Sequence, residues 1–480
     1  MVCEILQFKV SPGGNCVQGR EMHFSRNLAL TFLMSAIILC CFSNAYAIPA
    51  FSREHNTECA TCHTIYPELN EYGDAFLKNG FVWNKKSKDA APATEKKEVV
   101  KGEGDPDILR QLKELASVTT TPKEAETLIG GQKKSEPLWL AGLPQTLPLS
   151  ISATLNAAYN NDVETHKVDL STRAISLLAG GVFRDKLGFF LKYNLYAEGE
   201  YNPAVSNTPV NANPPYANDL DEFYLVWRNA LGTPVNLKAG RFRPTLSLWK
   251  KTNKTGVSDF ATTSFKVGKS QFSADTTEDA LEANAILFNR LYVAAGLVDR
   301  NGQKNNEGYG HVSVKIGGSD FRANEPDIDL DKESIFDYIY LVLGAYGYTG
   351  RNSIDLLSTQ LNNFYRAGAD VDLVVKNARL KLAFARERAT NPDFSSHAEN
   401  ITDVWVAQAE YMFTPDLLAF VRYELTSLSD GSRVNRYIPA VAFAPIQNTK
   451  ITLEYQHVAT EKSAANSSSD IVLLGARIAF

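Results

Sequence analysis

The chain has 480 residues, with 49 Lys and Arg against 54 Asp and Glu, so its formal net charge is −5 at pH 7. This mildly acidic balance gives no reason to expect a nucleic-acid partner, which a basic chain would attract. Hydrophobic residues make up 44% of the chain and the mean hydropathy is −0.21. These values argue against a bundle of membrane-spanning helices but are normal for a membrane β-barrel, whose strands alternate apolar and polar residues.

The N-terminus carries the features of an export signal. A basic residue, Arg26, precedes a short apolar run, and Ala45-Tyr46-Ala47 has the small-x-small pattern that signal peptidase cuts. The run is too short for a transmembrane helix. We therefore predict a signal peptide over residues 1–47, in which Met22 is an alternative start and 1–21 an upstream extension.

The motif Cys59-Ala60-Thr61-Cys62-His63 has the Cys-x-x-Cys-His spacing of a c-type haem attachment site. The two thiols bind the porphyrin covalently, and the imidazole that follows ligates the iron. A thioredoxin-like dithiol is the alternative, but the surrounding sequence lacks the strand–turn–helix pattern of that fold. The other four cysteines lie in or before the predicted signal, so no disulfide is expected. We predict one covalent haem c, bound by Cys59, Cys62 and His63, with His63 as the metal ligand.

The sequence does not determine the sixth ligand of the iron, and an open or water-bound position is one alternative. His55 is the nearest imidazole and is one candidate. Met412 is the one methionine after the predicted signal, and it falls in a predicted strand, which argues against a methionine ligand. The remaining histidines of the mature chain are expected in loops or in the barrel wall: His166, His311, His397 and His457.

Composition divides the rest of the chain into three parts. Residues 48–83 form the haem segment, which is too small to hold a core or cover a porphyrin unaided. Residues 84–146 are rich in Lys, Glu, Pro and Thr, which is typical of a solvated linker. Residues 147–480 read as a succession of two-faced strands.

The strand pattern is clear in three segments, 187–198, 378–387 and 417–426. In the first, Leu187 and alternate residues form an apolar face, while the opposite face carries Lys192 and other polar groups. A soluble β-sandwich would bury its second face, whereas here that face mixes Arg, Lys, Glu and Gly in strand after strand. The pattern predicts an all-β fold: an antiparallel outer-membrane β-barrel of about 16 strands, ending on an aromatic-terminated strand.

Connection lengths support the strand count. With the N-terminus in the periplasm, even-numbered connections should be short turns and odd-numbered ones longer external loops. The connection over 318–337 is long and acidic although it falls on the periplasmic side, so either this turn is extended or the count slips there. The lysine-rich loop over 250–269 would repel Fe(II) or attract an acidic partner protein; the alternative is a solvated loop or one that folds into the lumen.

Together these parts suggest that the small, helical haem segment plugs the barrel lumen or caps its periplasmic mouth. Lumen cations would then either meet the haem propionates or pair with neighbouring glutamates. The cations considered for this role are Lys192, Arg379, Arg422 and Arg477.

The haem segment also resembles a known family. The run Ile48-Pro49-Ala50-Phe51-Ser52-Arg53, the haem motif, the run from Tyr66 to Phe76 and Asn79-Gly80-Phe81 resemble the N-terminus of fused monohaem cytochrome–porin proteins, which include outer-membrane iron-oxidising cytochromes. The resemblance covers the barrel at the level of architecture. It implies a haem c in an N-terminal plug that passes electrons across the outer membrane. The linker over 84–146 is longer than in iron oxidisers, and the direction of electron flow is not implied.

We therefore expect a protein of the bacterial outer membrane, surrounded by lipid, that conducts electrons between periplasmic c-type cytochromes and an extracellular donor or acceptor such as iron. Whether it acts as an Fe(II)-oxidising enzyme is left open. The first alternative is a diffusion porin with an accessory or sensory haem. The second is a peroxidase-like enzyme, which needs an acid–base pair beside an open iron. No local His–Arg pair is visible, so no catalytic residue is predicted.

Overall fold

The computed structural model describes Phe51, residues 57–82 and most of residues 149–479. Within the last stretch it leaves out 161, 163–166, 198–218, 251–252, 271, 301–306, 325–338, 354–359, 396–398, 447 and 463–465. The predicted signal peptide, the predicted linker over 84–146, His55 and Phe480 lie outside the described residues. By its internal contacts the chain divides into a unit over 1–46 and a unit over 47–480, and the second unit contains everything described below.

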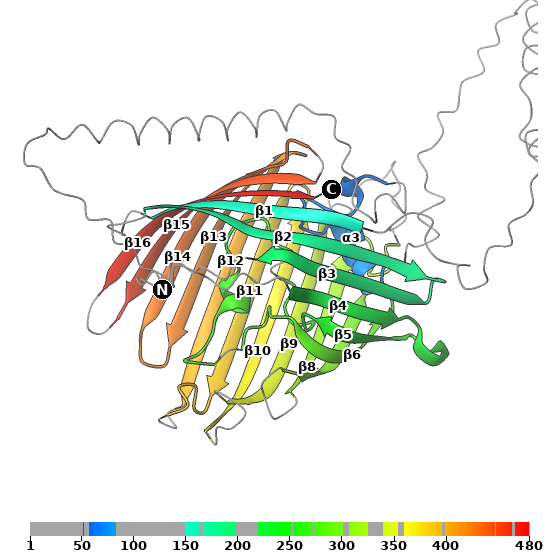
Figure 1. Ribbon diagram of the computed structural model, residues 1–480, viewed down its shortest axis with the longest axis horizontal. Helices are drawn as coiled ribbons and strands as arrows, with labels where there is room; N and C mark the ends of the chain where they lie inside the picture. Colours follow the sequence, from blue (N-terminus) through cyan, green and yellow to red (C-terminus); the bar gives the residue numbers. More distant parts are fainter. Residues whose placement is uncertain are drawn as a thin grey trace, which may run out of the picture. The chain divides into compact units, whose positions relative to one another are not determined.

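Sixteen antiparallel strands close into one barrel (Figure 1). Their bounds are β1 Leu149–Asn160, β2 Val168–Phe183, β3 Leu187–Ala197, β4 Asp219–Trp227, β5 Val235–Phe242, β6 Glu278–Leu287, β7 Leu291–Asp299, β8 Glu307–Gly317, β9 Ile339–Ser353, β10 Leu361–Val375, β11 Ala378–Ala389, β12 Asn400–Thr414, β13 Leu417–Leu428, β14 Arg433–Phe443, β15 Thr449–Glu461 and β16 Ser467–Ala479. Each strand pairs with its neighbours in sequence, and β1 closes the barrel on β16 with Ser152 opposite Ala479. The predicted fold class is confirmed.

The two faces of the strands differ as the sequence predicts. Along β16 the alternate residues Val472, Leu474 and Ile478 are exposed on the outer surface, at 37%, 45% and 40%. In β13 the intervening Arg422 and Glu424 face inward and are buried. An apolar exterior and a polar interior are the reverse of a soluble protein, and they fit a closed barrel surrounded by lipid. The chain is therefore an outer-membrane β-barrel.

Short turns join β2 to β3, β6 to β7, β10 to β11 and β12 to β13, whereas β3–β4, β5–β6 and β11–β12 have longer connections. The β2–β3 turn has positive φ at both Arg184 and Asp185, as tight hairpin turns require. The long periplasmic connection does not disturb the count, because β8 ends at Gly317 and β9 begins at Ile339. The turn is extended, and Ser319 and Phe321 within it contact the predicted haem segment.

Helical structure in the described residues is short. The haem segment contains a 3-10 turn, η1 (Cys59–Thr61), and one helix, α3 (Glu71–Lys78), while η2 (Ala230–Gly232) and α7 (Ala261–Ser264) lie in connections. Among the described residues, no helix has the length and hydrophobicity that crossing a lipid bilayer requires.

The connection between β5 and β6 folds into the lumen, which was one of the two expectations for it. Its backbone is held by inward-facing carboxylates of the wall: Val257 N donates to Glu454 Oε2 at 2.8 Å, and Ala261 N donates to Glu424 Oε1 at 3.1 Å. Phe260 is almost fully buried against the lumen side of β11 and β12. This inward loop and the haem segment together occupy the barrel interior.

Candidate functional site

The three residues of the predicted haem site lie on one tight turn. Cys62 N donates to Cys59 O at 3.1 Å, and His63 N donates to the same carbonyl at 3.0 Å. Neither cysteine is in a disulfide; Cys59 is buried and Cys62 is partly exposed. The turn thus brings two cysteine sulfurs and an imidazole together, which is the donor set that a covalent haem needs.

His63 is oriented by the chain that follows it. Its Nδ1 lies 3.3 Å from the carbonyl oxygen of Glu68. A carbonyl on one ring nitrogen fixes the tautomer and leaves Nε2 as the nitrogen available to a metal. Burial lowers the pKa of His63 to about 4, so the ring is neutral at pH 7, as a ligand must be.

Cys62 carries a protonated thiol. Burial, together with the neighbouring Cys59, raises the pKa of Cys62 to about 11. Because the thiolate is the reactive form of cysteine, this sulfur is a weak nucleophile at pH 7.

Helix α3 packs directly on the cysteine turn. Asn70 caps the helix by accepting from Gly73 N at 3.1 Å, and its amide donates to Ala60 O at 3.0 Å and to Thr61 O at 3.1 Å. A Cβ on Gly73 would lie 2.1 Å from Cys62 O, so only glycine permits this approach.

One carboxylate fixes the predicted haem segment to the barrel wall. Glu68 is fully buried and forms ion pairs with Lys381 and, at 3.1 Å, with Arg379, both on the lumen face of β11. Lys381 also pairs with Glu410 of β12 at 2.6 Å. Burial alone would raise the pKa of Glu68, but Lys381 and Arg379 outweigh it and hold the pKa below its usual range. The residue whose carbonyl orients His63 is thus itself held by the barrel.

Further contacts fix the segment on other sides. Leu69 N donates to Asn253 Oδ1 of the inward loop at 2.9 Å, and Asn79 Nδ2 donates to Phe321 O of the extended periplasmic turn at 2.9 Å. Glu71 pairs with Lys315 of β8 at 2.8 Å. Residues 57–82 are therefore bound inside the barrel from several directions, as a plug.

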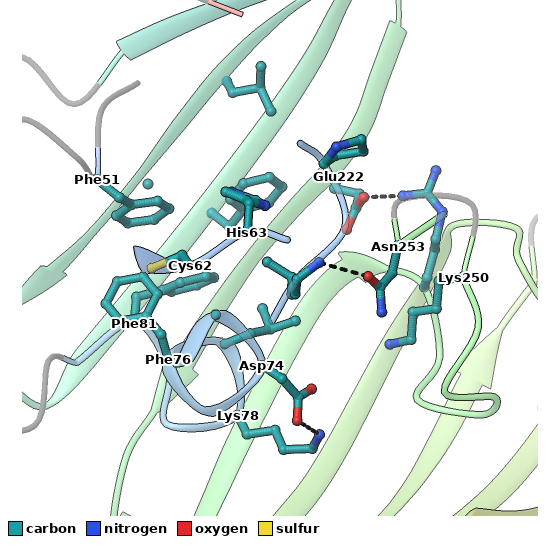
Figure 2. Close-up of a pocket in the computed structure, with 18 of the residues that line it drawn as sticks. Phe51, Cys62, His63, Asp74, Phe76, Lys78, Phe81, Glu222, Lys250 and Asn253 are labelled. Atoms are coloured by element: carbon teal, nitrogen blue, oxygen red, sulfur yellow. Dashed lines mark hydrogen bonds and ion pairs between the residues drawn. The ribbon is translucent and has the colours of Figure 1, made fainter. Parts of the chain in front are cut away.

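A cavity of about 370 Å³ lies between this plug and the wall. Cys62 and His63 line it from the plug (Figure 2). Cys59 lines it as well. Aromatic side chains line it as well and pack on one another across the plug–wall boundary, some stacked and some edge-on, with ring centroids 5.2–6.2 Å apart: Phe51, Phe76, Phe81, Phe190 and Tyr224. The volume and the apolar lining are those of a small-molecule or cofactor site.

The cations around this cavity differ from those that the sequence suggested. Lys192 pairs with Asp221 at 2.5 Å, Arg379 with Asp372 at 2.7 Å, and Arg422 with Glu424 at 3.0 Å. All three are thus lumen charges paired with carboxylates. Lys238 and Lys250 line the cavity instead, and the ammonium of Lys238 lies 3.9 Å from the Phe242 ring centroid.

The structure also locates two of the histidines. His311 of β8 is buried and lines the cavity, and its Nδ1 has no hydrogen-bond partner among the described residues. His457 of β15 pairs with Asp470 at 2.8 Å and is partly exposed. Both are wall residues, as expected, whereas His55, His166 and His397 lie outside the described residues.

Met412 packs in an apolar cluster with Ile65 and is not part of the cavity lining, which agrees with the argument against it as a ligand.

Sequence reasoning missed the Glu68 anchor and the wall residues of the cavity. Alternation assigns His311 and Lys381 to the lumen face, but it does not say which lumen residues meet the plug. These contacts can be found only from the three-dimensional structure, because Glu68 and Lys381 are 313 positions apart in the sequence.

No protein-family model matches the chain, and neither does any curated protein. Solved structures do match it. The anion-selective porin from Comamonas acidovorans has a TM-score of 0.51 at 12% identity, over 70% of this chain and 99% of that one. The outer-membrane channel DcaP of Acinetobacter baumannii has a TM-score of 0.47 at 11% identity, over 69% and 96%. Salmonella typhi OmpF in complex with daunomycin has a TM-score of 0.48 at 11% identity, over 70% and 97%.

The barrel has a porin-like fold. At such low identity the likeness to the Comamonas protein concerns the fold alone. The predicted barrel and its outer-membrane location agree with it. The haem site, by contrast, has no counterpart in these comparisons and stays a prediction.

Proposed function

We propose that the chain holds one covalent haem c inside the barrel and carries electrons across the outer membrane. The observation that supports this is the cavity in which Cys59, Cys62 and His63 converge, with barrel side chains forming its other walls. A haem bound there would supply a one-electron Fe(III)/Fe(II) couple at a point inside the membrane barrel.

Different residues of the chain would bind the haem covalently, ligate its iron and exclude water from it. Cys59 and Cys62 would bind it covalently, and His63 would present Nε2 because its Nδ1 faces the Glu68 carbonyl. The packed rings of Phe51, Phe76, Phe81, Phe190 and Tyr224 exclude water from one side of the cavity. Burial and limited solvent access are among the features by which a protein sets a haem potential.

The membrane explains why such an arrangement is useful. The apolar band of an outer-membrane barrel is about 25 Å tall, which is too far for efficient transfer in one step. A redox centre within the lumen shortens the distance to each side. The partners we propose are a periplasmic c-type cytochrome on one side and iron or another extracellular redox species on the other, in either direction.

The second candidate is a diffusion porin with an accessory or sensory haem. The comparison of folds, taken alone, favours this function over the first, because it relates the barrel to a porin and says nothing of the haem segment. A polar chamber of about 390 Å³ in the lumen also suits a solute path. The plug argues against a diffusion porin, because it occupies the lumen and is bound to the wall and to the inward loop.

Transport across liposomes separates the two functions. The purified protein is reconstituted with a reducible dye inside the vesicles, and a membrane-impermeant reductant is added outside. For a conduit we expect dye reduction that follows the haem α-band, together with exclusion of small sugars in a swelling assay. Sugar entry without dye reduction would overturn the conduit and leave the porin.

Matched variants make the result specific. The Cys59→Ser, Cys62→Ser double variant and His63→Ala should each abolish dye reduction. His457→Ala, on a partly exposed histidine paired with Asp470, should leave it unchanged. Covalent haem, visible on a denaturing gel, should disappear in the double variant alone.

A further inference from the structure

The lumen contains a second cavity with a different character, which we call the basic chamber. It has a volume of about 390 Å³ and is lined by lumen-facing residues of β1–β4 and β14–β16 and by the inward loop. On β1, Ser150 lines the first cavity, while Ser152, Thr154, Asn156 and Ala158 line the chamber. The chamber therefore continues the lumen toward the β1–β2 connection, on the side of the long external loops.

Most of the cations in the chamber wall are already neutralised. Lys192 and Arg243 pair with Asp221, Arg243 also pairs with Glu222, and Lys254 pairs with Asp259. Arg436 pairs with Glu424 at 2.7 Å. These pairs are ordinary lumen charges and need no further partner.

Three cations of the wall remain: Arg173, Lys450 and Arg477. Within the described part of the chain, none of them has a carboxylate at ion-pair distance. Asp169 is in the lining on the same strand as Arg173, but four residues along a strand span about 13 Å. The carboxylates of Glu68 and Glu454 are occupied, by Lys381 and Arg379 in the first case and by Ser258 and Val257 N in the second.

Two of these cations are direct cross-strand neighbours. Lys450 of β15 stands opposite Arg477 of β16, and Thr154 of β1 stands opposite Arg477 on its other side. Like charges in this position repel each other and destabilise a sheet unless an anion lies between them. Such a pair in the lumen therefore lowers the stability of the barrel, and a bound anion would remove the repulsion.

The donors of this pair are only partly used. Lys450 is 6% exposed and donates to the carbonyls of Thr255, at 2.7 Å, and Lys254, at 3.2 Å, which supply no net charge. The guanidinium of Arg477 lies 5.2 Å from the Tyr66 ring centroid, and its buried Nε has no hydrogen-bond partner in the described residues. An oxyanion would accept from this guanidinium and neutralise both charges.

We propose that the basic chamber binds a small oxyanion, of carboxylate or phosphate type, between Lys450 and Arg477. Arg173 adds a third positive charge from β2, and the hydroxyl of Thr154 adds a neutral donor. The inference rests on the wall of the barrel and does not depend on the proposed haem. Two sources share the required chemistry, a free anion from solution and a propionate of a haem in the adjoining cavity.

Calorimetric titration of the full-length protein in detergent with inorganic phosphate and with citrate tests the site. We expect one binding event per chain, weakened at least tenfold in Lys450→Gln and in Arg477→Gln. Arg477→Lys keeps the charge but loses the fork of donors, so it should bind with intermediate affinity. Arg388→Gln, a surface arginine paired with Glu399, is the matched control and should bind as the unmodified protein does.

The same titration on the Cys59→Ser, Cys62→Ser variant distinguishes the sources. Binding to both proteins assigns the site to a free anion, and binding to the haem-free variant alone assigns it to a propionate. Absence of binding in both, or equal binding in Arg477→Gln, overturns the proposal. Heat-modifiable migration on gels confirms that each variant retains its barrel, so that a lost signal is not a lost fold.

Discussion

At the scale of single residues, one glutamate couples the barrel to the proposed iron ligand. The side chain of Glu68 is held by Lys381 and Arg379 of β11, while its carbonyl oxygen faces Nδ1 of His63. Buried charges are tolerated in proteins when they are paired and hydrogen-bonded. Here the pairing also sets the position of the residue proposed to ligate the iron.

Removal of this carboxylate should loosen the plug. For Glu68→Ala we expect plug docking to weaken by about 3 kcal/mol, the lower end of the range for breaking a buried ion pair. The lower end applies because Glu410 and Asp372 still neutralise the two cations. The measurement is the rate of proteolysis within residues 57–82, and the exposed Glu399→Gln, expected to change it by less than about 1 kcal/mol, is the control.

A second residue-scale prediction concerns Gly73. Gly73→Ala places a methyl group 2.1 Å from Cys62 O, so helix α3 must move away from the cysteine turn. We expect the yield of covalent haem, read from a haem-stained denaturing gel, to fall several-fold. Gly347→Ala is the matched control, since a Cβ there meets nothing within 4 Å. An unchanged yield in Gly73→Ala would mean that the packing of α3 on the turn is not needed for attachment.

At the scale of elements, each strand divides its residues between lipid and lumen. Leu474, in the middle of β16, is 45% exposed on the apolar side, whereas its neighbour Leu473 is buried toward the lumen. The alternation that predicts strands from the sequence is therefore the same property that fixes their orientation in the membrane.

The loss of stability caused by a charge on the lipid-facing side of a strand can be measured. Leu474→Arg should destabilise the barrel by about 2–4 kcal/mol in lipid vesicles, the range for a cation near the middle of the bilayer. Leu231→Arg is the control: this residue is 85% exposed in the β4–β5 connection, and the change should stay within about 0.5 kcal/mol. Urea unfolding followed by tryptophan fluorescence gives both values. Equal costs would show that the face bearing Leu474 is not in lipid.

At the scale of the whole molecule, the plug takes no part in the strand pairing that closes the barrel. All sixteen strand pairings lie between residues 149 and 479, and the plug contributes no strand to them within the described residues. The plug meets the wall through side chains and through contacts with loops. The barrel should therefore assemble without it.

Deletion of residues 48–83 tests this separation. We expect the shortened chain to retain heat-modifiable migration and to show higher ion conductance in planar bilayers than the full chain, because the lumen is no longer occupied. Conductance equal to that of the full chain would show that the inward loop alone closes the pore. Loss of the barrel would show instead that the plug is needed for assembly.

The strands could be predicted from the sequence. Period-two alternation, turn residues and connection lengths are local, so they predicted a barrel of about 16 strands, but they left open whether the turn after Gly317 is extended or the count slips there. The spacing of Cys59, Cys62 and His63 is local as well, and one tight turn brings them together. The tertiary structure alone decided which lumen residues meet the plug. Glu68 with Lys381, His311 at the cavity and Lys450 opposite Arg477 depend on barrel closure and on how the plug and inward loop fill it, and no periodicity along the chain records those contacts.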